Sequence, residues 1–227
     1  MAAGTAEERP LDPEAVEGQQ AVYGRWTLAG YDVAVWGLIA PLVWRCPRRE
    51  VLRNYQRNLG RRHVELGPGT GYFLAHCELP ILPRVTLVDL NPEMLRHASQ
   101  RLRHLHPTPV RANVLEPLPV PRREHDSVAL NFLLHCVPGN LTTKGVVFGH
   151  AAAASRPGGR VFGSTVLAKG VPVSMRARRL VRLYNARGIF HNADDSLEDL
   201  RAQLDTYFVE YELTVRGCVA IFAGTVG

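Results

Sequence analysis

The chain has 227 residues, of which 46% are hydrophobic and 21% charged, and its formal net charge is +6. This length allows one domain with a full core and leaves little room for two. No apolar run approaches the ~20 residues that span a bilayer, and no apolar signal opens the chain, so we expect a cytoplasmic protein without a membrane span.

The start of the chain reads as a leader followed by a helical cap. Residues 1–17 are acidic and rich in small side chains, which predicts a disordered leader. Residues 18–60 read as the N-terminal helical cap, with breaks at Pro41 and Pro47. We expect the main domain to follow at 61–227.

A glycine-rich turn follows the first predicted strand of that domain. The strand ends in Glu65, and Gly67, Gly69 and Gly71 come directly after it, ahead of a short helix. Glycines let the backbone bend sharply and let a ligand approach closely, and a helix start offers unpaired N–H groups. A carboxylate at Glu65 would repel a pyrophosphate but can accept a hydrogen bond from an ammonium or hydroxyl group.

A second acid stands where a nucleotide-binding unit requires one. The apolar strand 85–89 ends in Asp89, which lies 18 residues after Gly71. In nucleotide-binding βαβ units an acid meets a ribose hydroxyl at an offset of roughly 20 residues. The turn and the acid together are therefore much more specific than the turn alone.

Beyond Asp89 the chain keeps alternating between helical and strand-like segments. Helices are predicted at 92–105, 142–155, 173–186 and 196–207, and strands at 108–112, 126–132 and 160–167. Two β-rich runs, 208–215 and 218–225, then predict a closing hairpin. Strands that alternate with helices imply a parallel sheet covered on both faces.

At these motifs the chain resembles the class I S-adenosylmethionine-dependent methyltransferases, in particular the small-molecule methyltransferases of secondary metabolism. Glu65 and the three glycines match the family's first motif, Asp89 its ribose-binding acid, and residues 157–159 the Pro-Gly-Gly turn before its fifth strand. The resemblance implies an α/β, Rossmann-like fold with a mostly parallel seven-stranded sheet and a C-terminal antiparallel hairpin. It also implies S-adenosylmethionine as cofactor and S-adenosylhomocysteine as product, bound by the domain 61–227.

The resemblance carries a set of donor-binding residues with it. Gly67, Gly69 and Gly71 would pass under the methionine part, Glu65 would orient nearby polar groups, and Asp89 would accept from the ribose.

Further residues would surround the adenine and the methionine. Leu90 and Met94 would pack on the adenine, or equally belong to the core. Asn113 stands where the family often has an Asp, and its carbonyl can still accept a hydrogen bond. Val114 would flank the ring, and Asn131 lies in the segment that often holds the methionine end.

His135 follows the fourth predicted strand and is the candidate general base, since its unperturbed pKa leaves it neutral near about pH 7. The alternative is a histidine that only hydrogen-bonds at a helix start. Tyr31 stands next to Asp32, which is similar to a Tyr-Asp pair in quinone-type methyltransferases, and we include it among the catalytic candidates. The segment 131–134 lacks the prolines of methyltransferases that act on nucleobases or Gln, which argues against nucleic acid as acceptor.

The acceptor pocket is predicted less sharply. We expect Tyr23, Tyr184, Phe190 and His191 to contribute to it, whereas Trp26 and Trp36 are expected to pack on the sheet.

These motifs predict methyl transfer to a small, apolar or aromatic metabolite by in-line displacement, with proximity and a histidine base. Two alternatives stay open: a protein or RNA methyltransferase that uses the basic helix 176–187, and a non-methylating partner protein that retains the fold. We expect a small-molecule acceptor rather than nucleic acid, and no metal. A homodimer would be compatible with the sequence.

Overall fold

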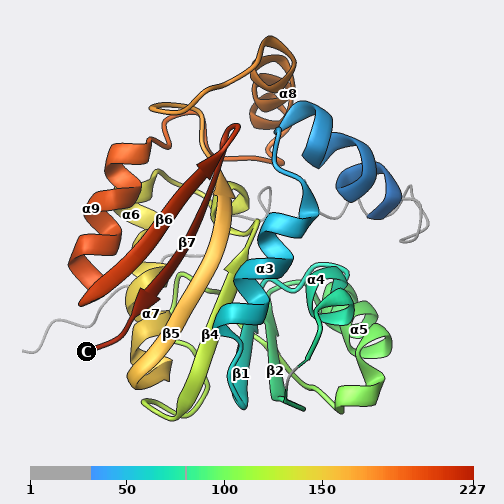
Figure 1. The fold of residues 1–227 in the computed structure, drawn as a ribbon, viewed down its shortest axis with the longest axis vertical. Helices are drawn as coiled ribbons and strands as arrows, with labels where there is room; N and C mark the ends of the chain where they lie inside the picture. The colour runs from blue at the N-terminus through green and yellow to red at the C-terminus, as the bar shows by residue number, and fades with distance from the viewer. Residues whose placement is uncertain (1–31, 80) are drawn as a thin grey trace, which may run out of the picture.

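The computed structural model describes residues 32–79 and 81–227; Tyr23, Trp26 and Tyr31 lie outside this part. Seven strands form one sheet in the order β3-β2-β1-β4-β5-β7-β6 (Figure 1). The strands are β1 (Arg62–Leu66), β2 (Arg84–Asp89), β3 (Thr108–Arg111), β4 (His125–Asn131), β5 (Ser155–Val166), β6 (Glu210–Arg216) and β7 (Val219–Thr225). The first five strands pair in parallel, and β7 runs antiparallel to both β5 and β6. The predicted fold class, including its closing hairpin, is confirmed.

Helices cover both faces of the sheet. One face carries α3 (Arg48–Asn58), α4 (Tyr72–His76) and α5 (Pro92–Arg101), and the other α6 (Leu141–Lys144), α7 (Val146–Ala154) and α9 (Leu197–Tyr207). Alternate residues of a strand point to opposite faces, so Leu87 joins the first apolar cluster and Val88 the second. Burial on both faces explains why the central strands read as continuous apolar runs.

Three of the remaining elements lie around the carboxyl ends of the parallel strands: η1 (Val33–Val43), a π-helix; α8 (Met175–Ala186); and the short turn η3 (Leu134–Cys136). The short turn η2 (Arg103–Leu105) joins the end of α5 to the start of β3. Ser174, which caps α8, donates a hydrogen bond to the carbonyl of Val43 at 3.4 Å. The start of α8 is thereby joined to the end of η1, and Figure 1 shows these two helices beside each other.

Several predicted boundaries were wrong: the helix expected at 92–105 ends at Arg101 and is followed by η2, and the strand expected at 160–167 begins at Ser155. The break expected at Pro41 does not occur, because η1 runs through it to Val43. Pro41 lacks the N–H that would continue the hydrogen-bond ladder of this helix, yet the helix continues beyond it and Trp44 closes it on the carbonyl of Ile39. The single helix expected at 142–155 is divided at Gly145 into α6 and α7, where a Cβ would lie 2.0 Å from Gln203 of α9.

Helix α3 lies in the predicted cap range 18–60 but packs directly on the sheet. The Asn54 amide donates to the carbonyl of Phe222 at 3.0 Å, and the Arg160 guanidinium donates to Asn58 at 2.8 Å. The domain division at 60 stays a prediction. Within the described residues, none of the helices has the length and apolar character needed to cross a bilayer.

Candidate active site

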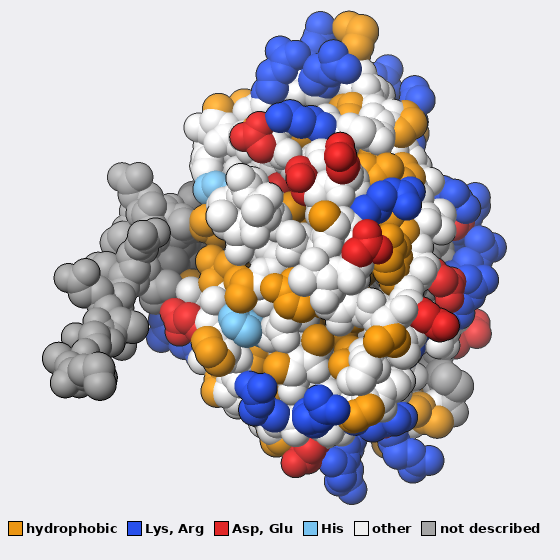
Figure 2. All heavy atoms as spheres, turned by 90° about the vertical axis from the view of Figure 1, so that its left-hand side faces the viewer, with side chains coloured by type: hydrophobic (Ala, Val, Ile, Leu, Met, Phe, Trp, Pro, Cys, Tyr) orange, Lys and Arg blue, Asp and Glu red, His pale blue; other side chains and the backbone are white. Residues whose placement is uncertain are grey.

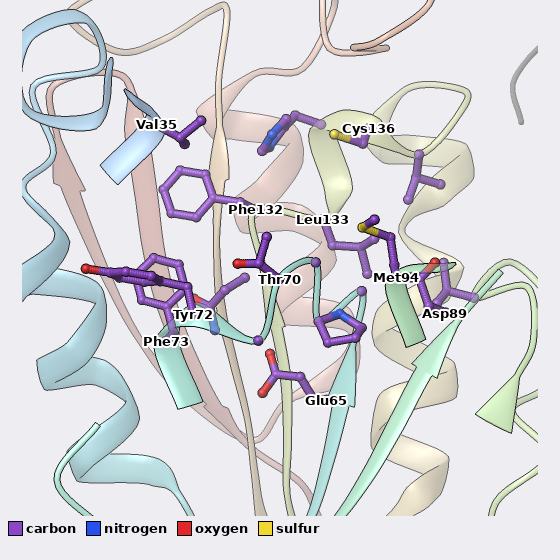
Figure 3. A pocket seen from close by; sticks show the side chains of 18 of the residues that line it. Val35, Glu65, Thr70, Tyr72, Phe73, Asp89, Met94, Phe132, Leu133 and Cys136 are labelled. Carbon is purple, nitrogen blue, oxygen red and sulfur yellow. The ribbon is translucent and has the colours of Figure 1, made fainter. Parts of the chain in front are cut away.

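A cavity of about 260 Å³ lies at the carboxyl ends of β1, β2 and β4, the edge at which ligands of open α/β sheets bind. It brings together most of the predicted site residues: Glu65, Gly67, Gly69, Gly71, Asp89, Leu90, Met94, Asn113, Val114, Asn131, His135, Tyr184 and Phe190. Figure 3 shows Asp89 and Met94 towards one end of the cavity, and Phe132, Tyr72 and Phe73 towards the other. We call these the donor end and the acceptor end.

The glycine turn at the donor end needs its glycines for two different reasons. Gly67 has a φ of +62°, and a Cβ there would lie 2.6 Å from the side chain of Leu133. Gly69 has a φ of +53°, and a Cβ there would meet nothing within 4 Å. The first glycine therefore allows the turn to pack on its neighbour, whereas the second leaves open space beside the cavity.

Glu65 is held by a buried chain of hydrogen bonds. The Tyr55 hydroxyl of α3 donates to one carboxylate oxygen at 2.5 Å, and His63 Nε2 lies 3.0 Å from the other. His63 Nδ1 lies 2.8 Å from the Ser127 hydroxyl, which also accepts from the Gly60 N–H at 2.8 Å. This set of bonds fixes the orientation of the carboxylate beneath the glycine turn (Figure 3).

Backbone N–H groups of Asn91 and Leu90 hold the Asp89 carboxylate at the end of β2. Its Oδ1 accepts from the Asn91 N–H at 2.8 Å, and burial raises the pKa of the carboxyl to about 6. Asn113 is also engaged, since its carbonyl accepts from the Leu115 N–H at 3.1 Å. A carboxylate has about four acceptor positions, so Asp89 can still accept from a ligand at the donor end.

Aromatic side chains wall the acceptor end. The ring of Trp36 lies 4.4 Å from that of Phe73 and 5.0 Å from that of Phe132, and all three line the cavity. Trp36 packs against the apolar cluster on this face of the sheet, as expected, and it also forms part of the cavity wall, which was not expected. The sequence did not single out Phe73, and Phe132 was noted only as part of the segment that follows the fourth strand. The position of Phe132 after β4 was the available signal.

His135 lies in the acceptor end with one ring nitrogen occupied. Its Nδ1 accepts from the Val166 N–H at 3.3 Å, and its ring lies 4.4 Å from that of Phe190. Burial, with the nearby Lys144 charge, lowers the pKa of His135 to about 3. A neutral imidazole that accepts at Nδ1 carries its proton on Nε2. The general-base role stays an untested prediction, and this geometry favours donation.

His191 does not line the cavity, although the sequence placed it there. Its N–H donates to the carbonyl of His135 at 2.7 Å, and its own carbonyl accepts from Lys144 at 2.8 Å. Lys144 is fully buried and lies 2.7 Å from the buried Asp195. Burial lowers the pKa of this lysine and raises that of Asp195 to about 6. Lys144, Asp195 and the backbone of His191 together hold the backbone of His135 in place.

The residue before η1 is tied to the glycine turn. Asp32 is buried, and its carboxylate lies 2.6 Å from Arg101 and accepts from the Thr70 hydroxyl at 2.7 Å. Arg101 also donates to Thr70 at 3.1 Å. The sequence had noted Asp32 only as the neighbour of Tyr31. This contact helps to hold η1, and with it Trp36, over the cavity.

The model of a methyltransferase domain family matches residues 43–207. The chain belongs to the S-adenosylmethionine-dependent methyltransferases. It is 50% identical over 213 residues to demethylluteothin O-methyltransferase of Streptomyces thioluteus, covering 93% of this chain and 92% of that protein. It is 36% identical over 204 residues to the physcion biosynthesis cluster O-methyltransferase of Aspergillus chevalieri, with 89% and 92% covered.

A solved structure shows the same fold. Geranyl diphosphate C-methyltransferase from Streptomyces coelicolor A3(2), in complex with Mg²⁺, geranyl diphosphate and S-adenosyl-L-homocysteine, superposes with a TM-score of 0.59 at 17% identity. This match covers 78% of each chain. In the part of the methyltransferase that the structure describes, no group of three or more His, Cys, Asp or Glu residues is placed to hold a metal ion.

The methyl donor of the enzyme is S-adenosylmethionine, and the cavity fits such a molecule. Asn131 lines the cavity, and its buried amide nitrogen makes no hydrogen bond of normal geometry to the described residues, its nearest polar partner being the Tyr55 hydroxyl. Open space lies beside Gly69, and the Asp89 carboxylate keeps acceptor positions beyond its bonds to backbone N–H groups. An unpaired buried donor is costly unless a ligand satisfies it, so the methyltransferase holds polar groups at the positions where a polar ligand would need them.

Proposed function

We propose that this methyltransferase transfers a methyl group to a hydroxyl oxygen of a small, flat, aromatic or otherwise apolar metabolite. The observation that carries this proposal is one cavity that joins the donor motifs to the aromatic wall of Trp36, Phe132 and Phe190. The two O-methyltransferase relatives support oxygen as the acceptor atom.

At the donor end we assign each polar group one task. The Asp89 carboxylate would accept from the ribose hydroxyls. The Asn131 amide would donate to the carboxylate of the methionine part, and Glu65 would accept from its ammonium group. Gly69 would leave room for the chain between them.

The adenine would lie among the neighbouring apolar side chains. Leu90, Met94 and Val114 line that side of the cavity. Asn113 can still accept there, because a carbonyl oxygen has two lone pairs and Leu115 uses one of them.

When bound, S-adenosylmethionine supplies a methyl group already activated by its sulfonium charge. The protein must then hold the acceptor oxygen in line with the methyl carbon and exclude water. Trp36 and Phe132 would hold the flat face of the acceptor, and aromatic faces also attract a sulfonium cation. The adjacent Phe190 and Tyr184 rings, 5.0 Å apart, would close the cavity from the side of α8.

A labelling experiment tests the proposal. The enzyme is incubated with methyl-labelled S-adenosylmethionine and, separately, with hydroxylated aromatics, matching aromatic amines, and total RNA. We expect label in the hydroxylated compounds, located on oxygen by mass spectrometry. Label confined to the amines or to RNA would contradict the proposal. Heat-denatured enzyme serves as the control.

A second candidate function is methylation of RNA or protein through α8. Arg176, Arg178, Arg179 and Arg182 are exposed on this helix, and no ion pair joins them to a carboxylate of the described residues. Figure 2 shows Lys and Arg side chains gathered at the top of the molecule, where Figure 1 places α8. Tight RNA binding with steep salt dependence would support this candidate.

A homodimer and a cytoplasmic location stay predictions from the sequence.

A further inference from the structure

We infer that His135 binds the acceptor as an oxyanion, by donating a hydrogen bond from Nε2, and that the acceptors are hydroxyl compounds acidic enough to ionise before they bind. This inference rests on the proposed O-methylation and narrows its substrate class. Vinylogous acids and acidic phenols belong to this class, whereas simple alcohols do not.

The first argument is the tautomer of His135. Val166 belongs to β5, and its backbone N–H points at Nδ1 from 3.3 Å. A backbone N–H can only donate. If Nε2 were to serve as a base, Nδ1 would have to carry the proton, and two donors would then face each other. The sheet thus fixes Nε2 as the protonated nitrogen, and no other described residue hydrogen-bonds to that atom.

The second argument is the surroundings of the ring. His135 is 4% exposed and packs between Phe132 and Phe190, whose rings lie 5.9 Å and 4.4 Å away. Burial together with the Lys144 charge opposes a positive imidazolium, which is why the pKa falls to about 3. A base with so low a pKa gains little by taking a proton from a hydroxyl group. A neutral N–H donor can hydrogen-bond an anionic oxygen, and that nitrogen cannot take a proton from a hydroxyl group.

The other titratable groups near His135 do not supply a base. Burial raises the pKa of the Cys136 thiol to about 12, and burial also raises the pKa of Tyr184. Lys144 is paired with Asp195. Within the described residues, the carboxylates that line the cavity are Glu65 and Asp89, and both lie at the donor end.

The reaction then balances without a proton transfer on the enzyme. The acceptor hydroxyl loses its proton to solvent before binding. The anionic oxygen attacks the methyl carbon, so that an O–C bond forms as the C–S bond breaks. The electron pair of the C–S bond stays on sulfur, which becomes the neutral sulfur of S-adenosylhomocysteine.

The test measures the ionisation of bound chromophoric acceptors. 4-Nitrophenol, 7-hydroxycoumarin and 4-hydroxycoumarin are titrated with pH by absorbance, free and in the complex with saturating S-adenosylhomocysteine. We expect the pKa of the bound probe to fall by about one unit, which is a tenfold preference for the anion. His135→Gln should keep much of this shift because its amide N–H can donate, and His135→Phe should lose it.

The outcomes separate this inference from the proposed function. A bound probe that stays neutral, with its pKa unchanged or raised in the wild type, overturns the oxyanion inference while aromatic binding stands. If S-adenosylhomocysteine binds but none of the three probes does, the aromatic hydroxyl acceptor itself is overturned, and this inference with it.

The pH dependence of kcat/KM for the same probes provides an independent test. For the wild type, the pH at which kcat/KM rises should follow the hydroxyl pKa from one probe to the next. An inflection at one fixed pH for all probes would reveal a titrating base on the enzyme and contradict the inference. Thermal unfolding of both variants checks that each is folded.

Discussion

At the donor end of the cavity, Asp89 and the turn with Gly67 and Gly69 continue directly from the ends of two neighbouring strands. At the acceptor end, the wall comes from residues far apart in the chain, among them Trp36 of η1 and Phe190 beyond α8. The donor end is therefore positioned by the backbone of the sheet, and each of its donor-binding tasks requires one type of residue. The acceptor end is held by side-chain packing, which tolerates exchange among apolar residues. This difference suits an enzyme family whose members share one methyl donor and each act on a different acceptor.

The largest effect is expected at Asp89. Asp89→Ala should weaken S-adenosylmethionine binding by roughly tenfold to a hundredfold, since a hydrogen bond to a charged acceptor contributes about 1.5–3 kcal/mol. Calorimetry measures this affinity, and Asp89→Asn tests whether the affinity depends on the charge of the side chain or on its shape. Because the pKa of Asp89 is raised to about 6, the carboxylate is lost by protonation below that pH. Wild-type affinity should fall as pH drops through this value, whereas the affinity of the alanine variant should not. Unchanged affinity would remove Asp89 from the ribose site.

A methyl group added at Gly69 should have the next largest effect. Gly69→Ala places a Cβ in the open space beside the cavity, and donor affinity should fall by about tenfold if a ligand occupies that space. Gly188→Ala is the matched control, because Gly188 also has a positive φ, +65°, with nothing within 4 Å of its Cβ position. Both variants should lose a similar stability, on the order of 1–2 kcal/mol. Equal donor affinity in the two variants would contradict the placement of the donor beside Gly69.

A substitution at the acceptor end should change the KM for the acceptor rather than the affinity for the donor. Trp36→Leu should raise the KM for the acceptor about threefold to tenfold, since each aromatic pair contributes about 0.5–1.5 kcal/mol. Its donor affinity should stay within about twofold, because its contacts are with other aromatic rings. Phe148→Leu, buried in the cluster on the opposite face of the sheet, controls for lost stability. A large loss of donor affinity in Trp36→Leu would mean that the two ends are not separate.

The smallest effect is expected at α8. The double variant Arg178→Ala, Arg182→Ala should change neither donor affinity nor turnover of a small acceptor by more than about twofold, since exposed charges contribute little. The assay is repeated at low and high salt. A strong loss of activity that appears only at low salt would favour the RNA or protein substrate instead.

The sequence was sufficient for the fold and for the donor end because local patterns encode both. Alternating strands and helices predicted the sheet, and Asp89 follows its strand at a fixed offset. The acceptor end was not readable in this way. Trp36 in an apolar helix looks like a core residue, and its role depends on how η1 lies over the sheet. The contact of Asp32 with Arg101 joins segments almost 70 residues apart, and no local pattern announces it. The side chain of Gln203 leaves no room for a Cβ at Gly145, where the predicted helix is divided, and this neighbour also lies far away in the chain.

The hydrogen bond from Tyr55 to Glu65 determines where chimeric enzymes could be joined. Helix α3 carries this tyrosine and is fastened to the sheet through Asn54, so importing a foreign α3 would disturb the carboxylate under the glycine turn. The segment before Pro47 carries Trp36 and contacts the rest of the domain through Asp32, through the Val43 carbonyl, which accepts from Ser174, and through the Trp44 carbonyl, which accepts from the Cys218 N–H. A crossover at Pro47 would therefore exchange part of the acceptor wall between relatives while the recipient keeps its own donor site. Recombination at that proline is a direct route to altered substrate range.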